Sequence, residues 1–179
     1  SEYGFGYDGS AYLWENATAA AGRDPLEHRI DGYFQLNGGK TVFRLNSDYY
    51  RNNGNAVNFL NVNRESRSAQ SDDLGLDASL VREISRGSLE VSAGYNMRDF
   101  VSGSGLNDQS SYAVDLALYH SLGFAPKTNY GIGFRFGSDD YSNNLDQDFY
   151  TTSLRWRYRA SQKTTAYSTL GWETRSTLG

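Results

Sequence analysis

The chain has 179 residues, enough for one domain with a sizeable core, and its formal net charge of −4 is too small to favour binding to nucleic acid. It contains no cysteine, which excludes disulfides, thiolate metal sites and a catalytic thiol. The mean hydropathy of −0.65 and the absence of a long apolar run exclude a helical membrane protein.

Apolar and polar residues alternate along most of the chain, which is the pattern of a β-strand with one apolar face. The first predicted strands are separated by a polar connection that contains Gly22 and Pro25, and then by a glycine turn at Gly38–Lys40. In order, we expect nine strands at Glu2–Trp14, His28–Asn37, Thr41–Tyr50, Asp73–Ile84, Ser88–Phe100, Ser110–Leu122, Asn129–Gly137, Asp148–Arg159 and Thr164–Arg175.

The predicted connections alternate in length. Short turns are expected at Gly38–Lys40, Ser85–Gly87 and Ala160–Lys163, with a modest turn that holds Gly123 and Pro126. Long loops are expected at Arg51–Asp72, Val101–Gln109 and Ser138–Gln147, and the Ala56–Val62 stretch of the first could continue a strand. Short turns on one side and long loops on the other are typical of an up-and-down transmembrane β-barrel.

The clearest example is the Asn129–Gly137 block, in which Ile132 and Phe134 share one face and Arg135 lies on the other. A soluble sandwich or lipocalin-like barrel would also alternate. The predicted length of about 10–13 residues favours the membrane barrel, because a tilted strand needs ~9–11 residues to cross a bilayer. The sequence therefore predicts an all-β, antiparallel meander that forms a transmembrane β-barrel, with residues 1–179 as one domain. Because nine is odd, we expect an incomplete barrel, completed by other strands or chains.

The alternation assigns residues to the two faces. We expect these residues to line the pore: Asp31, Arg44, Glu90, Asp115, Arg135, Arg155, Arg157 and Arg159. We expect these to face outer-membrane lipid: Phe34, Leu116, Ile132, Phe134, Leu154 and Trp156. Two interpretations of the arginines stay open: they form a positive wall that selects anions, or they pair with lumen carboxylates such as Asp31, Glu90 and Asp115.

Other candidate sites have weaker support. Asp139, Asp140, Asp146 and Asp148 could supply oxygen ligands for Ca²⁺, but their spacing fits no EF-hand, and a solvated acidic loop is the favoured interpretation. His28 and His120 lack a second histidine at ligand spacing and are interpreted as interfacial. No Gly-x-Ser-x-Gly elbow occurs. We therefore expect no enzymatic activity, no metal and no cofactor.

The opening run Tyr3–Leu13, together with the strand ends Tyr50-Arg51 and Arg98-Asp99-Phe100, resembles the β-barrel porin-2 group of bacterial outer-membrane proteins. The resemblance implies an outer-membrane location and transfers no catalytic motif. It implies a channel that passes small polar solutes, and related barrels in polysaccharide export keep export of a polymer open. The alternatives are a barrel that binds a partner without conducting, and a soluble carbohydrate-binding β-domain.

Overall fold

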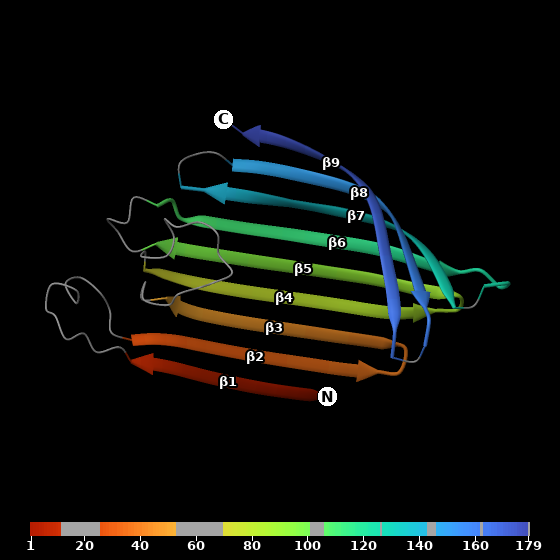
Figure 1. Cartoon of the computed structure of the whole chain (residues 1–179), viewed down its shortest axis with the longest axis horizontal. Helices are drawn as coiled ribbons and strands as arrows, with labels where there is room; N and C mark the ends of the chain where they lie inside the picture. The colour runs from red at the N-terminus through yellow and green to blue at the C-terminus, as the bar shows by residue number, and fades with distance from the viewer. Residues whose placement is uncertain are drawn as a thin grey trace, which may run out of the picture.

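The computed structural model describes residues 1–11, 26–52, 70–100, 106–125, 127–142, 146–161 and 163–178. Within these ranges the chain forms one antiparallel sheet of nine strands, each paired with its neighbours in sequence (Figure 1). The strands are β1 (Glu2–Ala11), β2 (Leu26–Gly38), β3 (Thr41–Asn52), β4 (Ser71–Ile84), β5 (Gly87–Phe100), β6 (Gln109–Ser121), β7 (Thr128–Tyr141), β8 (Asp146–Arg159) and β9 (Thr165–Leu178). The predicted fold class is confirmed.

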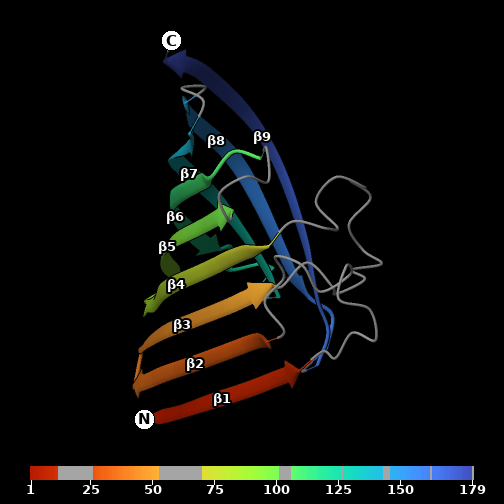
Figure 2. The ribbon, with the colours of Figure 1, turned by 90° about the vertical axis from the view of Figure 1, so that its left-hand side faces the viewer.

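The sheet is strongly arched. Figure 2 shows β1 to β6 stacked along one wall and β8 and β9 curving over the concave side. No pairing joins β1 to β9 within the described residues, so the sheet is open there. No helix among the described residues is long and apolar enough to cross a membrane.

The connections divide between the two ends of the strands, which we call the turn end and the loop end. The turn end carries the β2–β3, β4–β5, β6–β7 and β8–β9 connections. The turn between Gly38 and Thr41 is tight, and Gly39 has a φ of 59°, a left-handed conformation that glycine adopts without steric cost. The odd-numbered strands all run from the turn end to the loop end, so β1 and β9 point the same way.

One predicted loop is wrong. The stretch Ser138–Gln147 is mostly strand, because β7 continues to Tyr141 and β8 starts at Asp146. The backbone ladder persists there, with Gln109 opposite Tyr141 and Asp139 opposite Gln147. The loop was predicted because the apolar alternation stops at Gly137. Backbone pairing needs no apolar side chain and continues beyond that residue.

The remaining strand boundaries agree with prediction to within a few residues. β3 and β4 also extend beyond their predicted ends, to Asn52 and back to Ser71. Trp14, Gly22, Pro25, the Ala56–Val62 stretch and Pro126 lie outside the described residues.

Candidate channel face

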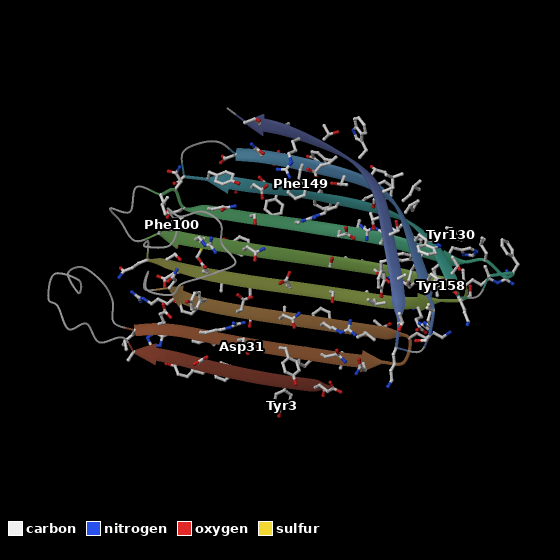
Figure 3. All side chains as sticks on the ribbon, viewed as in Figure 1. Tyr3, Asp31, Phe100, Tyr130, Phe149 and Tyr158 are labelled. Atoms are coloured by element: carbon white, nitrogen blue, oxygen red, sulfur yellow. The ribbon has the colours of Figure 1, made fainter. Side chains whose placement is uncertain are left out.

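The two faces of the sheet differ sharply in chemistry. Residues that lie directly opposite each other on paired strands point to the same face. A row of such residues, followed from strand to strand, therefore lies on one face of the sheet. One concave row consists of Gln35, Arg44, Ser79, Ser92, Asp115, Arg135, Thr151 and Glu173. A neighbouring convex row consists of Leu36, Phe43, Leu80, Val91, Leu116, Phe134, Thr152 and Trp172. Figure 3 shows the nitrogen and oxygen atoms of the first face spread over the arch.

The structure brings the predicted residues together as two sets. The register puts all eight predicted pore-lining residues on the concave face. It puts the six predicted lipid-facing residues on the convex face, where five are exposed and Trp156 is half-buried.

The large apolar side chains of the convex face form a band across the strands, which we call the apolar belt. This belt does not follow the rows of directly opposite residues. The row that starts at Tyr3 on β1 ends at Thr174 on β9. On β1 the large apolar residues are Tyr3, Phe5 and Tyr7, so they extend from that row toward the loop end. On β9 Leu170 and Trp172 lie on its turn side. The belt therefore drifts toward the turn end by roughly one residue per strand.

Two arginines of β8 reach across neighbouring strands of the concave face. Nη2 of Arg155 lies 2.5 Å from Oδ2 of Asp115 on β6, so the pair spans β7. The side chain can lie there because Gly133 carries none, and a Cβ at Gly133 would lie 2.6 Å from Nη2 of Arg155. Arg155 also donates from Nε to Oγ of Ser153, 3.1 Å away.

Arg157 reaches further. Its Nη2 donates to Oε1 of Glu90 on β5 at 2.7 Å, across β7 and β6. Its guanidinium carbon lies 4.2 Å from the ring centroid of Tyr119 and 5.4 Å from that of Tyr167. Tyr119 is 6% exposed and Ala117 beside it only 2%. The turn-end part of the concave face is thus packed, and the curl of the sheet brings β8 within reach of β5.

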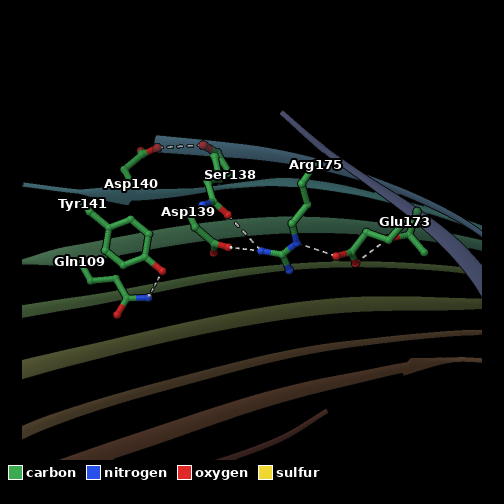
Figure 4. Close-up of polar contacts among 9 residues, drawn as sticks. Gln109, Ser138, Asp139, Asp140, Tyr141, Glu173 and Arg175 are labelled. Atoms are coloured by element: carbon green, nitrogen blue, oxygen red, sulfur yellow. Dashed lines mark hydrogen bonds and ion pairs between the residues drawn. The ribbon is translucent and has the colours of Figure 1, made fainter. Parts of the chain in front are cut away.

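Toward the loop end the concave face is open. A hollow of ≈ 540 Å³ lies there, and its lining includes Asp77, Asp115, Arg135, Phe149, Arg155 and Arg175. Arg175 on β9 lies between two carboxylates, 2.7 Å from Glu173 and 3.5 Å from Asp139 (Figure 4). The guanidinium carbons of Arg135 and Arg175 lie 5.3 and 5.6 Å from the ring centroid of Phe149.

The sequence reasoning missed Arg175, Glu173 and the Arg98–Asp73 pair, whose Nε and Oδ1 are 2.7 Å apart. The available signal was their alternate positions, Asp73 on β4, Arg98 on β5, and Glu173 and Arg175 on β9. The sequence reasoning named Asp31 as pore-lining but did not predict that Asp31 and Asp48 lie directly opposite each other on β2 and β3, with Asp77 next on β4. Charges of opposite sign therefore face each other from β2–β4 and β7–β9.

The other candidate sites do not assemble. Asp139 lies on the concave face, whereas Asp140, Asp146 and Asp148 belong to the convex rows. No group of acidic or histidine side chains in the described residues could hold a metal ion. His28 is on the convex face with Nδ1 2.9 Å from the Tyr7 hydroxyl, and His120 is exposed on the same face.

Comparison with known proteins gives a likeness of fold. No family model and no curated protein match the chain. Among solved structures, OmpT of Vibrio cholerae, an outer membrane protein folded in vitro and seen in its trimer form, superposes with a TM-score of 0.62 at 14% sequence identity. The match covers 86% of this chain and 48% of OmpT, so the chain spans about half the length of that protein. The nine-stranded meander therefore has the fold of an outer membrane β-barrel wall.

Proposed function

We propose that this chain forms part of the wall of a β-barrel in the bacterial outer membrane, and that its concave face lines a water-filled passage for small polar solutes. The observation that carries the proposal is the division of the sheet into a charged concave face and an apolar convex face. Membership of the porin-2 group stays a prediction, because no family model matches.

The drift of the apolar belt supports a membrane setting. A shift of one residue per strand, with a rise of ~3.3 Å per residue and ~4.8 Å between strands, corresponds to a tilt of roughly 35° between the strands and the normal to the belt. Strands of transmembrane barrels are tilted by about 35–45°. The apolar belt therefore lies parallel to the membrane plane when the strands have the tilt of a transmembrane barrel.

The concave face supports passage of polar solutes rather than apolar ones. The open hollow offers acids from β4 and guanidinium groups from β7–β9, and rings of charged side chains determine which solutes pass through a pore. Export of a polymer such as a polysaccharide would use the same wetted wall.

The test is conductance of the full-length protein after folding into a planar bilayer. Discrete, ohmic steps in KCl, with reduced current when small sugars are added, support the passage. Steps that only long saccharides block would point to polymer export instead. A protein that stays monodisperse without detergent and does not insert would overturn the membrane setting and favour a soluble carbohydrate-binding domain.

A second candidate is a non-conducting barrel that serves as a scaffold. The packing of Tyr119 and Arg157 at the turn end favours it, because side chains there occupy the concave side. Conductance of the Glu90→Gln variant distinguishes the two candidate functions. A scaffold closed by the Arg157–Glu90 pair conducts only in the variant, whereas an open channel conducts in both.

A further inference from the structure

Most of the basic residues that the structure describes fall into two groups that differ in their partners; Arg44, Arg135 and Arg159, on the concave face, belong to neither. On the strands, six arginines have carboxylate partners: Arg29, Arg51, Arg98, Arg155, Arg157 and Arg175. At the turn end, five exposed cations have no ion-pair partner among the residues that the structure describes: Lys40, Arg82, Arg86, Lys127 and Lys163. We call these five residues the turn rim.

The turn rim is regular. Every lysine of the sequence belongs to it, and each of the four short connections carries one cation, with Lys40 after β2, Arg86 after β4, Lys127 after β6 and Lys163 after β8. Arg82 adds a fifth cation on the convex row just beyond Leu80. A solvated end of a sheet would need no such placement of one cation in each turn.

The backbone holds these cations in place. The carbonyl oxygen of Lys40 accepts from the amide of Glu83 at 2.7 Å, and that of Arg86 accepts from Ser121 at 2.6 Å. The carbonyl oxygen of Lys127 accepts from Arg159 at 2.9 Å. The amide of Lys163 donates to Oγ of Ser161 at 3.2 Å. Three of the turns are therefore tied to an adjoining strand, β4, β6 or β8, and the fourth is tied within itself, so each of the four cations projects from an ordered backbone.

The turn rim lies just beyond the turn-end edge of the apolar belt, at the level expected for the boundary between membrane hydrocarbon and lipid headgroups. Tyr130 and Tyr158 lie on the convex face near the turns (Figure 3), and Trp156 is directly opposite Tyr130 on that face. The rings of Trp156 and Tyr158 stack with centroids 5.9 Å apart. Tyrosine and tryptophan gather where hydrocarbon meets headgroups. Cations placed just outside such aromatics lie level with the phosphates, and long basic side chains can reach that layer while their stems stay in apolar surroundings.

We propose that the turn rim binds the phosphate headgroups of anionic phospholipids in the leaflet at the turn end of the barrel. The inference rests on the proposed membrane setting and adds the lipid class. Charge complementarity carries it, since five exposed cations, without ion-pair partners in the part of the chain that the structure describes, meet a layer of negative charge. One such cation favours an anionic headgroup beside it by up to roughly fivefold.

The test uses the full-length protein with Trp14→Phe and Trp172→Phe, which leaves Trp156 as the reporter among these three tryptophans. The protein is folded into vesicles of phosphatidylcholine and phosphatidylglycerol in which one or the other lipid carries brominated acyl chains, and quenching of Trp156 is compared. We expect a roughly two- to fivefold preference for phosphatidylglycerol, which should fade in 1 M salt because the screening length falls to ~3 Å.

The variant Lys40→Gln, Arg82→Gln, Arg86→Gln, Lys127→Gln, Lys163→Gln should lose the preference. The matched control Arg44→Gln, Arg135→Gln removes two cations from the concave face and should keep it. Equal quenching by both lipids in the parent, or a preference that survives in the turn-rim variant, overturns the inference; an acidic protein partner for the rim would give that first result. Failure to insert into any vesicle overturns the membrane setting instead.

Discussion

Arg157 on β8 binds Glu90 on β5, three strands away along the sheet, with Nη2 2.7 Å from Oε1. In a flat sheet three strands span about 14 Å, so two side chains could meet only with difficulty, and the register adds a further offset. The pair therefore depends on the curl of β7–β9, and in turn it stabilises that curl. Arg155 and Asp115 make the same kind of diagonal contact one strand nearer.

The first prediction concerns this pair. Glu90→Gln keeps the shape of the side chain but removes the charge that faces Arg157, and should lower the free energy of unfolding by about 1–3 kcal/mol, the contribution of a hydrogen bond between charged groups. Urea titration of the protein in lipid vesicles measures it. Glu83→Gln, an exposed carboxylate at the turn end, is the control and should change stability by less than about 0.5 kcal/mol. Equal effects of the two variants would contradict a specific role for the pair.

The second prediction concerns the convex face. Phe134 lies within the apolar belt on β7, so Phe134→Lys should cost about 2–4 kcal/mol if that position is near the midplane of the bilayer. Thr151→Lys, on the concave face opposite Arg135, is the matched control and should cost much less, because its ammonium group stays in water near Glu173. A folding titration in lipid in which Phe134→Lys is neutral would reverse the assignment of the two faces.

The third prediction concerns ion selectivity. Of the five arginines predicted to line the pore, Arg155 and Arg157 are paired with Asp115 and Glu90. Asp31, Asp48 and Asp77 offset the other three on the same face, so we expect weak selectivity in the parent. Asp115→Asn leaves Arg155 without its carboxylate and should move the reversal potential in a KCl gradient toward anions. The shift should be larger at 0.1 M than at 1 M salt, because the Debye length falls from ~10 Å to ~3 Å.

The control for selectivity is Asp140→Asn, which removes a carboxylate from the convex face near the loop end. It should leave the reversal potential nearly unchanged. A strongly anion-selective parent would show instead that the arginine charges are not neutralised, and would restore the other sequence-based interpretation.

The fourth prediction concerns orientation. Because the sequence has no cysteine, single cysteines report the position of any site without background. Long connections of bacterial outer-membrane barrels face outward and short turns face the periplasm. Ser142→Cys at the loop end should therefore react with a membrane-impermeant maleimide on intact cells, and Ser85→Cys at the turn end only after the outer membrane is opened. Labelling of Ser85→Cys on intact cells would invert the topology.

Much of the fold could be predicted from sequence because each strand carries its own signal. The period-two pattern of Asn129–Gly137 placed Phe134 and Arg135 on opposite faces, and the glycines at Gly38–Lys40 marked a turn. The pattern failed where strands leave the apolar belt, as at Ser138–Tyr141, since polar residues there still pair through the backbone.

The candidate site was predictable only in part. Alternation identifies the face of Arg155 but not its partner, because the partner depends on register and curl across several strands. The role of Gly133 shows the difficulty, since its lack of a side chain matters only once Arg155 lies over it. The sequence interpretation did name Asp115 and Glu90 as possible partners, and the observed ion pairs agree with it.

The common direction of β1 and β9 limits how any barrel built on this sheet can close. Direct contact of the two edges would make a parallel seam in a sheet that is otherwise antiparallel throughout. Two copies in the same orientation would meet at two such seams, and an inverted copy would put turn ends and loop ends on the same side of the membrane. Antiparallel closure therefore requires an odd number of strands between β9 and β1, which makes the total even, as in other bacterial barrels.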